Sequence, residues 1–313
     1  MASLDPQLAG VVEEIAREGI PPWHALSVES ARRVEDEVFS GDDPPAVARV
    51  REFSIPGPED PIPVRVYDDT DDPTAPTPTV VFYHGGGWVL GTLDSIDPVC
   101  REIARRGEVV VVSVDYRLAP EQPFPAPLDD AYAALEWVAD NGASFGGDPD
   151  RLAVAGTSAG GNLAAATALR AREFDGPPIR AQALFYPITD RSFDTDSYAE
   201  HGDSRLLSAA DMRWFWGQYL RSPVDAANPF ASPLRADSLA DLPSATVVTA
   251  GHDPLRDEGV AYAERLDADG VATTHLHYPS MAHGFLSLTA DVDAADAAMD
   301  DAVGSLRRDL DID

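Results

Sequence analysis

The segment Gly156-Thr157-Ser158-Ala159-Gly160-Gly161 decides the fold, because it follows the apolar run Leu152–Ala155 and precedes an alanine-rich, helix-forming run. The pattern Gly-x-Ser-x-Gly between a strand and a helix is typical of a sharp turn that presents a nucleophilic serine. Such a turn strains the backbone at Ser158, so residues without side chains are needed two positions away on either side. Gly156 and Gly160 meet this need. A glycine-rich turn without any chemistry would show the same pattern.

A second glycine-rich segment, His84-Gly85-Gly86-Gly87-Trp88, directly follows the apolar run Val80–Tyr83. Consecutive glycines let backbone amides approach a ligand without obstruction by side chains, although glycines after a strand can also mark an ordinary turn. We predict an oxyanion hole here. Its expected amide donors are Ala159, Gly86 and Gly87. His84 precedes the serine in the chain, so we expect it to support this loop, together with Gly85, and not to act as the general base.

The general base is expected after the serine, because folds with this turn order their triad as Ser, then Asp or Glu, then His. We predict that the base is His283, which lies in the loop Pro279–Phe285 after the predicted strand Thr273–Tyr278. His275 and His277 alternate within that strand and therefore point to one face of it. We interpret them as ordinary strand residues, because no third group accompanies them to complete a metal site.

The acid that orients the base is predicted to be Asp253, the first acidic residue after the predicted strand Ala245–Ala250. In open α/β sheets the carboxyl ends of strands carry the catalytic groups. An acid in this place can hold the imidazole tautomer and stabilise the imidazolium. Pro254 follows directly, so Asp253 also fits the N-cap of a helix. Asp257, inside that helix, is the alternative acid.

These segments occur in one order along most of the chain, together with Asp115–Glu121, Asp253–Gly259 and His283–Phe285. In this the chain resembles the hormone-sensitive-lipase-like esterases of the α/β-hydrolase fold. The resemblance implies the same triad and oxyanion donors, and Thr157 stands where many members carry Asp. It also implies a carboxylesterase that hydrolyses short- to medium-chain esters through an acyl-enzyme intermediate, with no cofactor and no metal.

The chain has 313 residues, of which 44% are hydrophobic, and its predicted strands alternate with helical patterns. This alternation predicts an α/β fold with a mostly parallel central sheet, covered by helices on both faces, after an antiparallel first hairpin. The predicted strands are 48–55, 62–67, 79–83, 109–114, 152–155, 181–186, 245–250 and 273–278.

Two segments interrupt the alternation, and the resemblance implies that together they form a helical cap. We divide the chain into residues 1–45, the N-terminal part of the cap; 46–187, the first part of the catalytic core; 188–224, the cap insertion; and 225–313, the second part of the core. Apolar side chains near the triad and in the insertion are expected to line the substrate pocket. The candidates are Trp88, Phe215, Phe285 and Leu286.

The charge is unusually acidic, with 54 Asp and Glu against 23 basic residues and a net charge of −31. All the basic residues are arginine. Nucleic acid and anionic membranes are poor partners for such a surface. Because salt screens self-repulsion, this composition indicates adaptation to high salt, as in halophiles. An acidic protein from a GC-rich mesophile is the alternative.

The remaining features point to a cytoplasmic protein. Cys100 is the single cysteine, so no disulfide forms within the chain. We predict no signal peptide and no integral membrane segment, because no apolar run has the required length. A homodimer is left open. Alternative functions are a non-catalytic small-molecule receptor on a hydrolase scaffold, or hydrolysis of a lactone, an amide or a carbamate.

Overall fold

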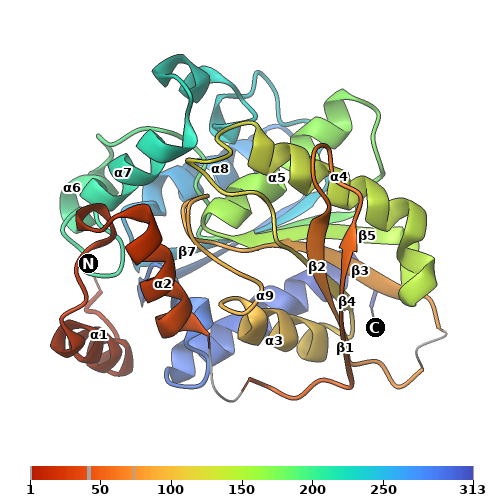
Figure 1. The fold of residues 1–313 in the computed structure, drawn as a ribbon, viewed down its shortest axis with the longest axis horizontal. Coiled ribbons are helices and arrows are strands. Elements are labelled where there is room, and N and C mark those ends of the chain that lie inside the picture. Colours follow the sequence, from red (N-terminus) through yellow and green to blue (C-terminus); the bar gives the residue numbers. More distant parts are fainter. Residues whose placement is uncertain (1, 41–43, 73–74, 313) are drawn as a thin grey trace.

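The computed structural model describes residues 2–40, 44–72 and 75–312, which form one eight-stranded sheet between two layers of helices (Figure 1). Each predicted strand overlaps an observed one. The strands are β1 (Arg49–Ile55), β2 (Ile62–Asp68), β3 (Thr77–Tyr83), β4 (Val110–Val114), β5 (Gly147–Thr157), β6 (Ala181–Phe185), β7 (Ser244–His252) and β8 (Thr273–Ala282).

The strand order across the sheet is β1-β2-β4-β3-β5-β6-β7-β8. β1 pairs with β2, and β2 with β4, in antiparallel register, whereas the pairs from β4 through β8 are all parallel. This confirms the predicted mostly parallel sheet and its antiparallel first hairpin. The carboxyl ends of β3, β5, β7 and β8 therefore lie along one edge, where the predicted site residues follow them.

Five helices cover the two faces of the sheet. α3 (Asp97–Gly107) and α9 (Asp293–Asp309) pack together on one face, and α4 (Ala126–Asn141), α5 (Ala159–Glu173) and α8 (Arg256–Ala268) lie on the other (Figure 1). Between the helices are short 3₁₀ turns: η2 (Gly142–Phe145), η3 (Pro223–Ala227), η4 (Pro233–Arg235) and η5 (Phe285–Ser287).

Side chains that alternate along the central strands contribute to two hydrophobic cores, one on each face of the sheet. In β3, Val81 and Tyr83 belong to the cluster under α4 and α5, whereas Val80 and Phe82 belong to the cluster under α3 and α9. This alternation follows from the two-residue period of a strand. All four side chains are fully buried, which stabilises the fold by about 1.5–3 kcal/mol each for side chains of this kind.

The remaining helices gather at one end of the molecule, beside the carboxyl edge of the sheet (Figure 1). From the N-terminal part come α1 (Pro6–Glu18), η1 (Trp23–Ala25) and α2 (Val28–Phe39). From the segment between β6 and β7 come α6 (Asp196–His201) and α7 (Ala209–Tyr219). Residues 41–43, within the predicted segment 1–45, lie outside the described residues.

The two groups of helices are joined by a contact between His24 of η1 and Asp211 of α7. Oδ1 of Asp211 lies 2.7 Å from Nδ1 of His24 and accepts a hydrogen bond from the His24 backbone amide at 2.9 Å. The other oxygen of Asp211 accepts from Ser208, which caps α7. One buried carboxylate thus binds the N-terminal segment and caps a helix of the insertion.

Candidate active site

The turn between β5 and α5 has the backbone geometry that the sequence predicts. Ser158 adopts φ 55° and ψ −114°, a positive-φ conformation that side chains disfavour, and its amide donates to the carbonyl of Phe185 at 2.8 Å. A side chain at Gly160 would overlap the carbonyl oxygen of Tyr83, and one at Gly156 would overlap the backbone of Gly160. The two glycines therefore permit this close approach of strand and helix.

Ser158, His283 and Asp253 form a continuous chain of polar contacts. Nε2 of His283 lies 3.0 Å from Oγ of Ser158, and Nδ1 lies 2.8 Å from Oδ2 of Asp253. The other carboxylate oxygen of Asp253 accepts from the amide of Leu255 at 2.8 Å. Asp253 is 1% exposed, so its carboxylate is fixed by these two partners and shielded from water. In this arrangement the imidazole can take the proton of the serine hydroxyl.

The structure corrects one detail of this acid. Asp253 is not the N-cap of α8, because that helix begins at Arg256 and its N-cap is Leu255. Its side chain closes a tight turn ahead of the helix and leaves one oxygen for His283. The alternative acid, Asp257, is bound elsewhere: its carboxylate accepts from the amide of Ser197 at 2.7 Å and from Arg256.

The glycine-rich loop after β3 lies beside Ser158. Gly86 and Gly87 have φ values of 100° and 59°, and both border the same cavity as Ser158. A side chain at Gly86 would overlap the Leu90 carbonyl, and one at Gly87 would overlap the ring of Phe215. Ala159, the first residue of α5, is buried at the helix N-terminus, where the helix dipole favours negative charge. These are the three positions from which oxyanion donors are expected.

His84 is buried beneath this loop. Its Nδ1 donates to the carbonyl of Gly85 at 2.7 Å, and its ring stacks on Tyr116 at 4.2 Å. The Tyr116 hydroxyl donates in turn to the His84 carbonyl at 2.8 Å. Burial lowers the pKa of the His84 imidazole from 6.5 to about 4, although its bond to Gly85 opposes this shift. A neutral, fixed imidazole suits the support of the loop.

A cavity of about 150 Å³ opens above Ser158 and His283. Its wall is mostly apolar, and residues from the sheet edge, the N-terminal helices and the insertion all contribute to it. The apolar side chains of the wall are Ile15, Trp23, Phe39, Leu90, Ile96, Tyr186, Leu206, Leu207, Phe215 and Leu288. The ring of Tyr186 also packs edge-on against His283 at 4.9 Å.

Only Phe215 of the four predicted pocket residues borders this cavity. Trp88 has φ 62° and turns into the core, where its ring stacks on Tyr219 at 4.0 Å. Phe285 and Leu286 are fully buried in the cluster that contacts α9. The prediction failed for these three because closeness in sequence to a catalytic residue does not fix the direction of a side chain. The amphipathic pattern of the first 40 residues was the available signal for Ile15, Trp23 and Phe39 of the wall.

His275 and His277 point to one face of β8, as predicted. A ring nitrogen of each lies 2.9 Å from Oγ1 of Thr249 on the neighbouring strand β7. Burial is the largest cause that lowers the pKa of each imidazole, so the neutral rings are favoured. Within residues 2–40, 44–72 and 75–312, no group of three or more His, Cys, Asp or Glu side chains could hold a metal ion.

No helix in the described part of the chain combines the length and hydropathy needed to cross a membrane.

Comparisons with known proteins identify the family of the chain. The sequence profile of the alpha/beta hydrolase fold family matches residues 80–287. The chain is 44% identical to the esterase LipI of Mycobacterium tuberculosis, over 83% of this chain and 82% of that protein. It is 36% identical to an ethyl acetate hydrolase of Pseudomonas putida, over 98% of this chain and the whole of that protein.

Solved structures of esterases are similarly close. A hyperthermophilic esterase from the archaeon Pyrobaculum calidifontis superimposes with a TM-score of 0.92 at 40% identity, covering 98% of this chain and 99% of that one. Relatives that match most of the chain are thus named as an esterase, an ethyl acetate hydrolase and, for LipN of Mycobacterium tuberculosis at 45% identity, a carboxylic ester hydrolase. The chain therefore belongs to the alpha/beta-hydrolase family, and within it to the carboxylic-ester hydrolases.

Proposed function

We propose that this enzyme hydrolyses short- to medium-chain carboxylic esters with Ser158 as nucleophile, His283 as general base and Asp253 as orienting acid. One observation carries the proposal: contacts of 3.0 Å and 2.8 Å join Ser158 to His283, both of which border the cavity, and His283 to the buried Asp253. A nucleophile within hydrogen-bond distance of its base, and a base oriented by a third group, are the requirements of this chemistry.

In the acylation half-reaction, Oγ of Ser158 attacks the ester carbonyl carbon while Nε2 of His283 takes the hydroxyl proton. The negative charge that develops on the carbonyl oxygen is stabilised by the amides of Ala159, Gly86 and Gly87. The tetrahedral intermediate collapses when His283 returns its proton to the leaving alkoxide. The products are a free alcohol and an acyl group bonded to Ser158.

In the deacylation half-reaction, His283 takes a proton from water, and the resulting hydroxide attacks the acyl carbon. The second tetrahedral intermediate uses the same oxyanion hole. His283 then protonates Oγ of Ser158 as the carboxylic acid leaves. Asp253 stabilises the imidazolium in both halves without becoming protonated itself.

The proposed acyl-chain length rests on the cavity. A volume of about 150 Å³ suits a small ester, and the apolar wall suits alkyl groups. The Pseudomonas relative, which matches 98% of this chain, is named for ethyl acetate. Lactones, amides and carbamates stay alternative substrates for the same groups. The receptor alternative is not supported, because the relatives are named as enzymes.

We also propose that the N-terminal helices and the insertion act together as the cap. Ile15, Trp23 and Phe39 from the first group, and Leu206, Leu207 and Phe215 from the second, border one cavity. The contact between His24 and Asp211 joins the groups. Both segments that we assign to the cap, residues 1–45 and 188–224, thus supply side chains to the cavity wall.

An acyl-chain series tests the proposed function. p-Nitrophenyl esters from acetate to palmitate are compared by kcat/KM, with Ser158→Ala as the blank. We expect the maximum between acetate and octanoate and a steep fall beyond it. A maximum at palmitate, or equal rates for wild type and Ser158→Ala, would contradict the proposal.

A further inference from the structure

One carboxyl group in the cavity wall has no part in the proposed mechanism. Glu35 of α2 is 8% exposed and borders the cavity that contains Ser158 and His283. Its atom Oε2 is buried and has no hydrogen-bond partner among the residues that the structure describes. Buried polar atoms are almost always paired, so an unpaired one at the wall of a binding cavity points to a partner that is brought in by a ligand.

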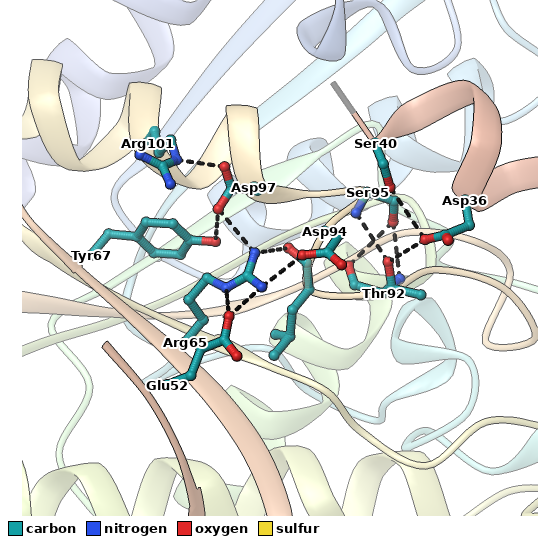
Figure 2. A network of polar contacts seen from close by, with 11 residues as sticks. Asp36, Ser40, Glu52, Arg65, Tyr67, Thr92, Asp94, Ser95, Asp97 and Arg101 are labelled. Atoms are coloured by element: carbon teal, nitrogen blue, oxygen red, sulfur yellow. Dashed lines mark hydrogen bonds and ion pairs between the residues drawn. The ribbon is translucent and has the colours of Figure 1, made fainter. Parts of the chain in front are cut away.

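Hydrogen bonds on either side of Glu35 hold helix α2 in place. One helical turn before it, Arg32 donates to the carbonyl oxygens of Val89 and Ala119, each at 2.9 Å. The next residue, Asp36, accepts from Oγ1 of Thr92 at 3.0 Å (Figure 2). α2 is therefore bound on both sides of Glu35 to the segment that continues from the oxyanion loop.

The segment beneath Glu35 is itself fixed. Thr92 and Ser95 exchange hydrogen bonds, with the Thr92 amide donating to the Ser95 hydroxyl at 3.0 Å and the Ser95 amide to the Thr92 hydroxyl at 3.1 Å. Arg65 of β2 donates to the Leu93 carbonyl at 3.1 Å and to Asp94 at 2.7 Å (Figure 2). This network leaves little freedom for the wall at Glu35, and a fixed polar group gives specificity at small entropic cost.

The surroundings favour the uncharged form of this carboxyl group. Burial raises the pKa of Glu35 to about 7, and the neighbouring charge of Asp36 adds to the rise. The nearby Ser95 hydroxyl and Gly91 amide oppose this rise. His84 borders the same cavity and stacks on Tyr116, and both rings are uncharged near neutral pH, because burial lowers the pKa of His84 and raises that of Tyr116. A neutral carboxyl group offers both an O–H donor and a carbonyl acceptor.

We propose that Glu35 is a specificity-determining residue that binds a hydroxyl group on the ester substrate. A hydroxyl group both donates and accepts, so it matches a carboxyl group that has one free edge. The apolar side chains around Glu35, among them Leu90 and Ile96, would contact the carbon skeleton. The inference rests on the proposed function, because it names the class of ester, a hydroxy ester, that the same site would prefer.

Pairs of esters that exchange a hydroxyl for a methyl group test the proposal. p-Nitrophenyl 3-hydroxybutyrate against p-nitrophenyl 3-methylbutyrate probes the acyl side, and 2-hydroxyethyl butyrate against propyl butyrate probes the alcohol side. A site built to bind a hydroxyl discriminates strongly, so we expect wild-type kcat/KM to favour the hydroxy ester of at least one pair by about 10-fold or more.

Glu35→Leu is expected to bring that ratio close to one by slowing the hydroxy ester, with the methyl ester changed by less than about 3-fold. Glu35→Gln, which still donates and accepts, is expected to keep most of the preference. Glu37→Gln is the matched control, because it makes the same substitution at an exposed position of α2 and should leave the ratio unchanged. If Glu35→Leu does not fold, the pH dependence of the ratio replaces it: the wild-type ratio should change as pH rises through about 7, because Glu35 then loses its O–H donor, whereas the ratio of Glu35→Gln should stay constant.

Several outcomes would overturn the proposal. They are a wild-type kcat/KM ratio near one in both pairs and a ratio that persists in Glu35→Leu. A third is a stronger wild-type preference for an ester that carries an ammonium group in place of the hydroxyl. Equal losses on both members of a pair would also overturn it, since they show a purely structural role. Failure of the proposed function looks different, because neither ester of any pair would be hydrolysed by the wild-type enzyme.

Discussion

Nδ1 of His283 lies 2.8 Å from Asp253, whereas Asp257, four residues further along the chain, is bound by Ser197 and Arg256. The two carboxylates therefore have separable roles. Asp253→Asn should lower kcat by about 10⁴, because an amide at this position favours the wrong imidazole tautomer. Steady-state kinetics on p-nitrophenyl butyrate would measure the loss.

Asp257→Asn is the matched control, and we expect it to lower kcat by less than about 10-fold, since it removes contacts to α6 and not to the base. Circular dichroism of both variants checks that the fold is retained. If Asp257→Asn were the more damaging change, the acid would be assigned wrongly, while the reaction class would stand.

The nucleophile can be identified by covalent labelling. A fluorophosphonate should add once per chain, at Ser158, and intact mass should show no adduct on Ser158→Ala. Loss of the serine should cost on the order of 10⁶ in kcat, as in other serine hydrolases. An active wild-type enzyme that takes up no label would exclude the acyl-enzyme route.

The glycine-rich loop after β3, the proposed oxyanion loop, is expected to tolerate no side chain at Gly86. Its φ of 100° and the overlap with the Leu90 carbonyl mean that Gly86→Ala must displace the loop, so kcat should fall by about 10²–10³, the effect of losing one donor. Gly10→Ala in α1 is the control, because that position has open space around it and helical backbone. It should leave kcat unchanged and stabilise the helix by up to about 1 kcal/mol. Equal kinetics for the two variants would refute a role for this loop.

Glu35 makes the stability of the protein depend on pH. Its pKa rises from 4.5 in the unfolded chain to about 7 in the fold, so the unfolded state releases its proton first as pH rises. The free energy of unfolding should therefore fall between pH 4.5 and 7 and level off above, by about 3 kcal/mol for a shift of this size.

Glu35→Gln, which cannot ionise, should remove this term. Compared with wild type, it should gain stability at pH 8 and show no such gain at pH 4.5. Urea unfolding at both values measures the difference between the two proteins. An equal difference at both pH values would show that Glu35 does not titrate in this range.

The acidic surface predicts a dependence on salt. With a net charge of −31 and no lysine, self-repulsion should weaken the fold at low ionic strength. The melting temperature should rise with KCl from tens of millimolar to molar, as the Debye length falls from about 10 Å at 0.1 M to about 3 Å at 1 M. Screening alone saturates early, so a further rise above 1 M that is larger in sulfate would show strengthened apolar burial. A flat melting temperature would reject salt adaptation.

The sheet could be predicted because its signals are local. Strands such as β3 and β4 are apolar runs bounded by turn residues, and a run of this kind can be read from neighbouring residues alone. Ser158, Asp253 and His283 could be placed for a related reason, because each directly follows a strand of a parallel sheet. Topology then brings together residues that lie up to 125 positions apart.

The cavity wall could not be predicted in the same way. Trp88 stands beside the oxyanion glycines in sequence, yet its positive φ turns the ring into the core. Glu35 looks like one more acidic residue on an amphipathic helix, and only the packing of α2 on the Thr92–Ser95 turn buries it. Side-chain direction and helix docking are tertiary properties, so periodicity does not report them.

The contact between His24 and Asp211 also bears on how the substrate preference of this enzyme can evolve. It joins two stretches of chain that are 187 residues apart, and neither of them supplies a strand of the sheet. Ser158, Asp253 and His283 each follow a strand of the sheet, whereas these two stretches contribute part of the cavity wall. Substitutions, insertions or exchanges in either stretch can alter which ester fits while the reacting atoms keep their places. Divergence of substrate range among relatives would then be concentrated in these two stretches.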